Sequence, residues 1–199
     1  MSGFAVASLD ELDRVPVAHG LEWRPVRRRF GIRAFGVNAY TAEKAGDWVV
    51  EQHDESRLGH EELYVVVRGR ARFTIAGEEV DAPAGTLVFL GDPALERVAV
   101  AEEAGTTVLA VGGKPGEAFQ PSAWEWYFLA EAQPPEQGLE TMRGGVDLYP
   151  ENGAMRYHLA RHLARAERPD EARRELARAL ALAPDLERYV ADDDDLAAL

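Results

Sequence analysis

Histidine and glutamate side chains, whose nitrogen and oxygen atoms can bind a ligand, gather between residues 53 and 62. His60 and Glu62 are two positions apart, so they share one face if this segment is an extended strand. His53 ends an earlier apolar run and is able to reach that face from a neighbouring strand. Glu61 and Glu62 do not form a paired-carboxylate site, because adjacent strand residues point to opposite faces. This stretch is the strongest candidate for chemistry in the chain.

Two further groups of ligand-type residues lie near the C-terminus. His158 and His162 are four residues apart, so they lie on one face of a helix. No further ligand is evident beside them, and we interpret them as surface residues. Residues 192–195 are four consecutive aspartates. They lack the glycine and the distal glutamate of a calcium-binding loop, so we expect a solvated break.

The elements that must position His53, His60 and Glu62 are short strands. Apolar alternation is punctuated by glycine-containing connections of two or three residues, which are typical of hairpins. Many closely spaced strands predict a sandwich or barrel and not a parallel sheet. The expected strands are residues 32–40, 48–52, 63–67, 71–75, 78–81, 86–90, 97–101 and 106–111.

Two glycine motifs in this β-rich part carry a resemblance to a known family. Glu62 is followed after six residues by Gly69, and Gly77 is followed after five residues by the turn Pro83-Ala84-Gly85. This pattern resembles the cupin family over roughly residues 30–113. The resemblance implies a small jelly-roll β-barrel whose inward side chains surround a pocket.

The resemblance also implies a metal-ligand set. Cupins often bind a divalent ion through histidines and one glutamate, and His53, His60 and Glu62 match that first motif in part. In the second motif the histidine position falls on Glu96. If Glu96 faces inward, two imidazoles and two carboxylates could hold manganese, iron, nickel or zinc. The metal-free alternative keeps His53 and His60 as hydrogen-bonded residues at the barrel mouth.

Glu96 and Arg97 cannot both face the interior, because neighbouring strand residues alternate. If Arg97 faces inward, its guanidinium can pair with Glu62, and a protein cation takes the place of the metal. The sequence leaves this choice open.

The C-terminal part contains an internal repeat of 34 residues. Residues 136–150 align without a gap on residues 170–184, and Pro150 meets Pro184. That period is typical of paired-helix repeats. The segments from 119 to 186 resemble tetratricopeptide repeats, which implies a surface for protein interaction. The expected helices are residues 124–132, 136–148, 154–166 and 169–183.

The first of the two repeats departs from the family pattern. Trp126 occupies a position that normally takes a small residue, and Gly138 and Gly145 replace alanines. One interpretation is that Trp124 and Trp126 pack against the barrel instead. Two repeats are fewer than the three usually needed for a stable stack, so the barrel, the terminal segment or another chain must help.

Composition excludes several classes of function. The 199 residues carry a formal net charge of −13, which disfavours nucleic acid and anionic membranes as partners. Cysteine is absent, so disulfides and thiolate metal sites are excluded. The start lacks the features of a secretory signal, and we expect a cytoplasmic protein. The basic run at 24–29 is interpreted as a solvated strand flank, with an anion site as the alternative, and residues 112–116 are interpreted as a linker.

These patterns predict an α+β protein with a barrel domain at 1–113 and a helical module at 114–199. The favoured function is binding: the barrel holds an unknown small molecule or a divalent metal through His53, His60, Glu62 and Glu96. The helices dock a protein partner or mediate self-association, a homodimer being one option. The alternative is a metal-dependent oxygenase or isomerase. The sequence contains no nucleophile elbow, phosphate loop or dinucleotide motif, and it leaves enzyme status undecided.

Overall fold

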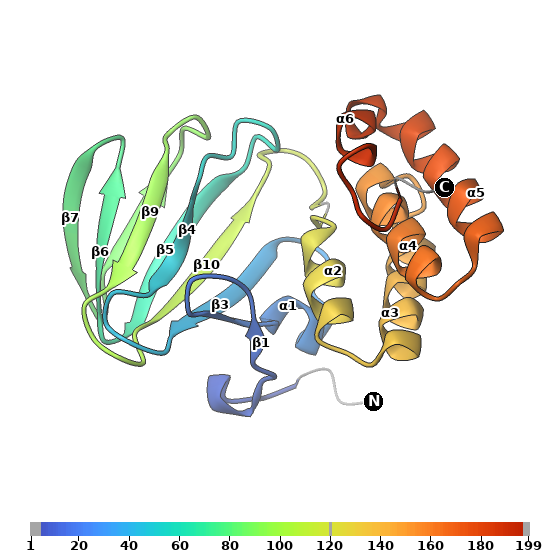
Figure 1. The fold of residues 1–199 in the computed structure, drawn as a ribbon. Helices are drawn as coiled ribbons and strands as arrows, with labels where there is room; N and C mark the ends of the chain where they lie inside the picture. Colours follow the sequence, from blue (N-terminus) through green and yellow to red (C-terminus); the bar gives the residue numbers. More distant parts are fainter. Residues whose placement is uncertain (1–4, 120, 197–199) are drawn as a thin grey trace. The chain divides into compact units, whose positions relative to one another are not determined.

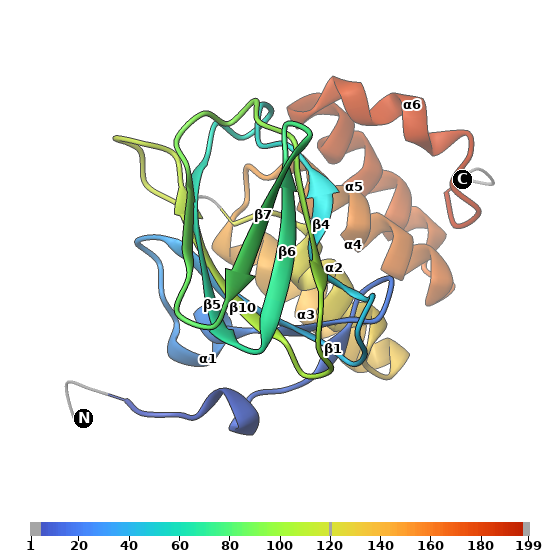
Figure 2. The same cartoon turned by 90° about the vertical axis from the view of Figure 1, so that its left-hand side faces the viewer.

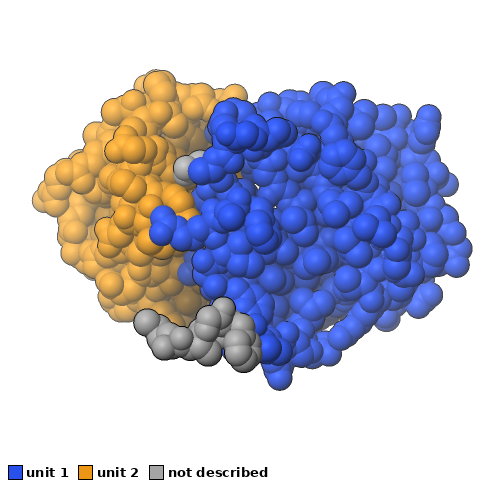
Figure 3. All heavy atoms as spheres, turned by 180° about the vertical axis from the view of Figure 1, so that it is seen from behind, with its two compact units in different colours: residues 1–121 blue, residues 122–199 orange. Residues whose placement is uncertain are grey.

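The computed structural model describes residues 5–119 and 121–196. By its contacts the chain divides into two compact units, residues 1–121 and 122–199 (Figure 3). The domain boundary between residues 113 and 114 stays a prediction. The predicted domains, 1–113 and 114–199, include residues 1–4, 120 and 197–199, which lie outside the described part of the chain. In the described part of the chain, the helices are all too short or too polar to cross a lipid bilayer.

The first unit consists of two antiparallel sheets (Figure 1). The larger sheet has the strand order β1-β2-β3-β10-β5-β8, and the smaller has the order β4-β9-β6-β7. In Figure 2, β6 and β7 of the smaller sheet lie nearest the viewer. The elements are η1 (Leu9–Glu11), β1 (Val15–Pro16), β2 (Leu21–Arg24), α1 (Val26–Phe30), β3 (Gly36–Ala42), β4 (Trp48–His53), β5 (Glu61–Arg68), β6 (Arg70–Ile75), β7 (Glu78–Pro83), β8 (Leu87–Leu90), β9 (Arg97–Ala101) and β10 (Thr107–Gly113).

The core of this unit lies between the two sheets. Tyr64 and Val66 of β5 point into it from one sheet, and Phe73 and Ala99 point into it from the other. Each of these strands alternates because one face is buried. The motif glycine Gly69 has a φ of +68°. It lies so close to Thr106 that a β-carbon would fall 2.4 Å from the threonine hydroxyl oxygen. These observations confirm the predicted antiparallel barrel.

The basic run at 24–29 differs from its predicted form. It contains the short helix α1, which follows Pro25 and ends at Gly31 in the left-handed conformation. Arg27 of this helix is buried and donates a hydrogen bond to the carbonyl oxygen of Ile32 at 3.3 Å. Its guanidinium also lies 5.8 Å from the ring centroid of Phe119. The run is therefore partly structural and not a solvated strand flank.

The second unit consists of antiparallel helix pairs, as the 34-residue repeat predicted. Trp126 packs within the helical core with Leu139, Met142 and Met155. A β-carbon at Gly145 would lie 2.4 Å from Cδ1 of Trp126, so the glycine makes room for the indole. The helices are α2 (Trp124–Glu131), α3 (Pro135–Leu148), α4 (Gly153–Arg165), α5 (Pro169–Leu182), η2 (Pro184–Leu186) and α6 (Glu187–Val190).

The two histidines of α4 are not surface residues. His162 is buried, and His158 stacks on Tyr127 with ring centroids 4.4 Å apart. Burial lowers the pKa of His158 to about 4, with the nearby charge of Arg161 acting in the same direction. The prediction failed because helical spacing shows which residues share a face but not which face is covered.

The aspartate run returns to the same helix. Asp193 accepts a hydrogen bond from the Tyr157 hydroxyl at 2.9 Å and pairs with Arg161 at 3.0 Å. Asp195 pairs with Arg165 at 2.8 Å. The run is thus bound to α4 and is not a solvated break.

Candidate functional site

The polar cluster of the first unit forms where β4 ends and β5 begins. His53 is the last residue of β4, and it lies opposite Arg97, the first residue of β9. Glu62 is the second residue of β5. The connection between β4 and β5 carries Glu55 and His60. The ends of three strands and one loop therefore bring these five side chains together.

Loop hydrogen bonds hold Glu55 beside the strands. Its backbone N–H donates to the carbonyl oxygen of Pro93 at 2.8 Å, and its own carbonyl accepts from Gly59 at 2.7 Å. Asp54 accepts a hydrogen bond from the backbone of Ser56 at 2.8 Å, which tightens the same turn. The segment 54–59 is therefore an ordered turn that places a carboxylate between the two predicted histidines.

Three side chains form the centre of the cluster. One ligand-type atom each from His53, Glu55 and Glu62 lies within 4.8 Å of the other two. The Nε2 atom of His53 is 3.7 Å from Oε2 of Glu62 and 3.9 Å from Oε1 of Glu55. His60 approaches from the side, with its Nδ1 atom 3.4 Å from Oε2 of Glu55. The structure thus brings together three of the four predicted residues, and it adds Glu55.

Arg97 is the residue that faces the interior. Its side chain is completely buried and its Nη2 atom donates to Oε2 of Glu62 at 2.8 Å. A second hydrogen bond runs from Nη1 to the carbonyl oxygen of Leu95 at 2.9 Å. The Tyr64 hydroxyl donates to the same Glu62 oxygen at 2.5 Å. Of the two alternatives that the sequence left open, the structure has the buried guanidinium.

Glu96, the fourth predicted ligand, does not join the cluster. It is exposed, and its Oε1 atom accepts a hydrogen bond from the Gln52 side chain at 2.7 Å. The physical reason is strand alternation: once Arg97 points inward, its neighbour must point outward. A ligand set that includes Glu96 is therefore not assembled.

Glu55 is the residue that sequence reasoning missed. Its Oε2 atom is buried and has no hydrogen-bond partner among the described residues. Burial, reinforced by the charge of Glu62, raises the pKa of Glu55 to about 7. A signal did exist, since Glu55 is a carboxylate between two candidate histidines. It could be used only if the loop was known to fold back onto the strands.

Glu62 behaves in the opposite way. Burial tends to raise its pKa, but hydrogen bonds from His53 and Tyr64 and the charge of Arg97 outweigh burial and lower it. Burial is the largest influence on the pKa of His53 and lowers it, but the Glu62 carboxylate and the Glu51 carbonyl together outweigh burial and raise this pKa. Glu62 is thus the fixed negative charge of the cluster.

His60 is the second imidazole of the cluster and contacts Glu55 alone among the described carboxylates. Burial lowers its pKa. Its ring lies 5.9 Å from that of Phe119, centroid to centroid. It is therefore a mostly neutral base at the edge of the cluster.

The donor set suits a divalent transition metal. The Nδ1 atom of His53 lies 2.7 Å from the carbonyl oxygen of Glu51, and a carbonyl only accepts, so Nδ1 carries the proton. In neutral His53 the Nε2 lone pair then points to the two carboxylates, an arrangement typical of metal-binding histidines. The unpartnered Glu55 oxygen is a second donor without a competing hydrogen bond. One imidazole and two carboxylates suit manganese, iron, nickel or zinc.

Comparison with known proteins gives a family-model match for the helical unit. Residues 129–191 match the family model described as tetratricopeptide repeat. No curated protein sequence is similar enough to the chain to count as a relative. The helical unit is therefore tetratricopeptide-like, as its 34-residue period predicted.

Solved structures similar to the chain are cupin proteins. KdgF from Halomonas sp. is 16% identical, with a TM-score of 0.46, and the match covers 62% of this chain and 99% of that one. An RmlC-like cupin from Shewanella frigidimarina is 15% identical with a TM-score of 0.43, covering 58% and 95%. A sugar phosphate isomerase of the cupin superfamily from Silicibacter pomeroyi is 18% identical with a TM-score of 0.46, covering 55% and 76%. Likenesses this distant carry no conclusion about the activity of the first unit.

Proposed function

We propose that the barrel binds a divalent metal ion through His53, Glu55 and Glu62. The observation that carries this proposal is the three-residue cluster, whose ligand atoms lie within 4.8 Å of one another. Its Glu55 carboxylate is buried with an oxygen that lacks a partner in the described ranges. A buried carboxylate in that state is costly, and coordination to a metal removes the cost.

The charge of Arg97 is compatible with such an ion. Two carboxylates, Glu55 and Glu62, face one guanidinium, so the ionised cluster has one net negative charge when the histidines are neutral. A bound divalent ion changes the net charge of the cluster to one positive charge. This costs less free energy than burying a divalent ion without compensating charges. Arg97 engages Oε2 of Glu62, so the metal and the guanidinium share this carboxylate.

The bound ion would supply a Lewis acid that holds an oxygen atom of a small polar ligand. The protein then acts as a ligand-binding module. The ordered loop 54–59 keeps Glu55 in place, and Arg97 keeps Glu62 ionised. These residues need no rearrangement to present their donors.

The test is metal binding by the full chain. The protein is purified without immobilised metal, stripped with a chelator and titrated calorimetrically with zinc, manganese and nickel. We expect one ion per chain for the wild type. In Glu55→Gln and His53→Ala we expect affinity to fall at least about tenfold, in the range measured for lost metal-site partners.

Glu96→Gln is the matched control, because it removes a carboxylate next to the site that lies outside the three-ligand group. Its affinity should equal that of the wild type. Failure of the wild type to bind any of the three metals, or an equal loss in Glu96→Gln, would refute the proposed site.

A metal-dependent enzyme of isomerase or oxygenase type is the second candidate, and His60 is the observation that favours it. Its imidazole lies 3.4 Å from Glu55 yet is not one of the three grouped ligands, so it can act on a bound molecule. His60→Gln should then bind the metal as tightly as the wild type but no longer convert the bound molecule. Loss of both together would count against a separate catalytic role.

For the helical unit we propose protein interaction, including self-association. The support is the tetratricopeptide match over residues 129–191, a fold that commonly presents binding surfaces. Light scattering of the full chain over a range of concentrations tests self-association. A mass that stays that of one chain at every concentration would leave an external partner as the proposal.

A further inference from the structure

A polar pocket lies at the opposite end of β5 from the cluster of His53, Glu55 and Glu62. It has a volume of about 420 Å³ and is lined by residues of η1, β2, β3, β5 and β10. Arg68 of its lining ends β5, while Glu62 lies near the start of that strand. Six residues of extended strand separate the two by roughly 20 Å. The volume is within the usual range for small-molecule sites.

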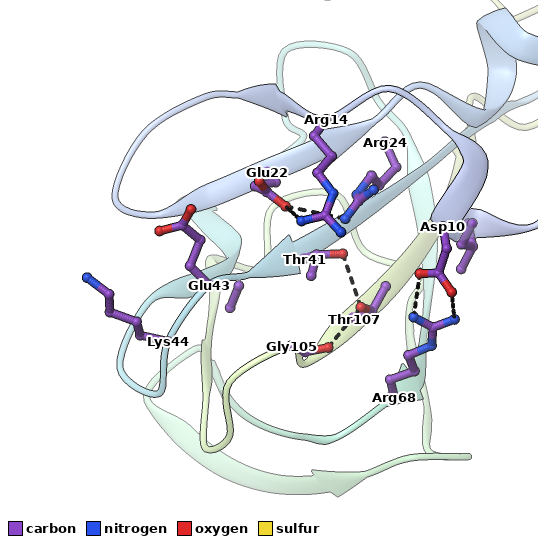
Figure 4. Close-up of a pocket in the computed structure, with 12 residues that line it drawn as sticks. Asp10, Arg14, Glu22, Arg24, Thr41, Glu43, Lys44, Arg68, Gly105 and Thr107 are labelled. Atoms are coloured by element: carbon purple, nitrogen blue, oxygen red, sulfur yellow. Dashed lines mark hydrogen bonds and ion pairs between the residues drawn. The ribbon is translucent and has the colours of Figure 1, made fainter.

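Two arginines in this pocket share a single carboxylate (Figure 4). The Oε2 atom of Glu22 lies 3.3 Å from Nη2 of Arg24 and 3.7 Å from Nη1 of Arg14. Both contacts are longer than those of a well-formed charged hydrogen bond. Over the whole lining, four basic side chains (Arg14, Arg24, Lys44 and Arg68) face three acidic ones (Asp10, Glu22 and Glu43), which leaves the pocket with one net positive charge.

Arg24 makes that excess charge costly. Its side chain is only 4% exposed, and its Nε atom has no hydrogen-bond partner within the part of the chain that is described. The remaining contact, from Nη1 to the carbonyl oxygen of Leu12, is long at 3.4 Å. Burial and the charge of Arg14 both lower the pKa of Arg24. A buried guanidinium with such loose partners is stabilised by an anion nearby.

Arg14 is the side chain that can meet this anion. It is 62% exposed and holds Glu22 only at 3.7 Å. Figure 4 shows its guanidinium beside that of Arg24 at the edge of the pocket. Most of its N–H groups therefore point to solvent, and they can form the two-pronged contact that arginine makes with carboxylate or phosphate oxygens.

Two threonines on the neighbouring strands offer a complementary surface. The Thr107 hydroxyl donates to the carbonyl oxygen of Gly105 at 3.0 Å, so its proton is already used. In the 3.0 Å contact between Thr41 and Thr107, Thr41 must therefore be the donor. Both hydroxyls are then left with free lone pairs and no free proton. They can accept hydrogen bonds from a ligand's hydroxyl groups.

The other charged residues of the pocket cancel one another: Glu43 and Lys44 carry opposite charges, and Asp10 pairs with Arg68. Arg68 donates two hydrogen bonds to Asp10, at 2.7 and 2.8 Å. Figure 4 shows this pair on the side of Thr107 away from Arg14 and Glu22. The pair closes the pocket without adding net charge, so the uncompensated charge stays at Arg14 and Arg24.

We infer that this pocket binds a small hydroxylated anion. Its carboxylate or phosphate group contacts Arg14 in front of Arg24, and one of its hydroxyl groups donates to Thr41 or Thr107. The inference concerns a site separate from the metal cluster and does not depend on metal binding.

The experiment measures ligand binding to the full chain by calorimetry and by thermal shift. The probes are glycerol 3-phosphate, glycerate, inorganic phosphate and glycerol. We expect glycerol 3-phosphate or glycerate to bind at millimolar concentrations or below, and the one that binds shows whether phosphate or carboxylate is preferred. Inorganic phosphate should bind at least about tenfold more weakly, and glycerol should not bind.

Three variants separate the two halves of the inference. Arg14→Gln should weaken the hydroxylated anion at least about tenfold. Thr41→Val should weaken it by several-fold and leave inorganic phosphate unchanged. Arg72→Gln is the matched control, because Arg72 is an arginine of similar exposure, 52% against 62% for Arg14, that lies on the other sheet and pairs with Glu102.

The results that would overturn the inference are equally definite. One is a wild type that binds neither hydroxylated anion, and another is an equal loss in Arg14→Gln and Arg72→Gln. Tighter binding of inorganic phosphate than of either hydroxylated anion would overturn the role of the threonines. Loss of metal binding in Glu55→Gln should leave anion binding intact, so the two proposals can fail separately.

Discussion

The polar cluster of the barrel and the polar cluster beside α4 differ in how completely their charged side chains are paired. At the end of the barrel, the Arg97 guanidinium pairs with Glu62, and one buried oxygen of the neighbouring Glu55 has no hydrogen-bond partner in the described structure. In the helical unit, Asp193 and Asp195 each contact an arginine of α4 at about 3 Å or less. Tyr157 of the same helix donates a hydrogen bond to Asp193.

The difference separates a binding site from a structural contact. Buried polar groups are usually satisfied, so a cluster that satisfies its members is adequately explained by folding alone. The α4 cluster holds the C-terminal segment in this way. An incompletely paired cluster such as that of Glu55 keeps capacity for a ligand. The following predictions test this contrast.

The largest effect is expected from Arg97→Ala. Removing a completely buried guanidinium leaves Glu62 charged and without its main partner, which typically costs about 3–5 kcal/mol. Urea unfolding of the full chain should show this loss in the transition of the barrel unit. The control is Arg178→Ala, which removes a mostly exposed ion pair of the same 2.8 Å length and should cost about 0–1 kcal/mol. Equal losses in the two variants would abolish the contrast.

The next effect is a pH dependence of the helical unit. The pKa of His158 is lowered to about 4 in the folded chain, from an ordinary value of 6.5. Between about pH 6.5 and about pH 4, His158 is protonated in the unfolded chain but not in the folded chain. The free energy of unfolding therefore falls as the pH falls through this range. A shift of this size corresponds to about 3 kcal/mol.

Unfolding curves of the helical unit at a series of pH values check this prediction. His158→Gln should flatten the dependence, whereas His19→Gln, a change in the other unit, should leave it as in the wild type. A helical unit equally stable at pH 4 and pH 7 would show that His158 does not titrate in this way.

An intermediate effect comes from packing and not from charge. Gly145→Ala places a β-carbon 2.4 Å from Trp126, and such overpacking costs about 1–3 kcal/mol. The neighbouring glycine is the matched control: a β-carbon at Gly144 meets no described atom within 4 Å. Gly144→Ala should therefore stabilise the helix by about 0.5–1 kcal/mol. Thermal unfolding distinguishes the opposite signs, and a loss in both variants would contradict the role given to Trp126.

The smallest effect is expected from Asp195→Asn. The substitution weakens contacts with Arg161 and Arg165, which are partly exposed pairs and so contribute about 1 kcal/mol together. Chemical unfolding measures the change, with Asp170→Asn, a highly exposed pair with Arg173, as the control. A loss of unfolding free energy as large as that in Arg97→Ala would contradict the contrast, because the α4 cluster would then contribute as much stability as the barrel cluster.

Much of the fold could be predicted from residue patterns. The turn at Gly69 and the alternation around Tyr64 predicted a β-hairpin barrel, and the 34-residue repeat predicted the helix pairs. These features depend on local conformation and on a repeating period, both of which are properties of neighbouring residues.

The composition of the site could be predicted only in part. His53, His60 and Glu62 were identified from their residue types and spacing, but Glu55 and the orientation of Arg97 were not. Alternation along β9 shows that Glu96 and Arg97 face opposite sides, without showing which side is the interior.

The sequence by itself therefore determined most of the barrel strands, the four long helices and most of the residues that could do chemistry. The tertiary structure decided that Arg97 faces Glu62, that the loop returns Glu55 to the histidines, and that the aspartate run binds α4. The first and the last of these outcomes join residues far apart in the chain, and the second depends on the fold of the loop. Their pairing depends on strand register, burial and long-range electrostatics, which exist only once the chain has folded.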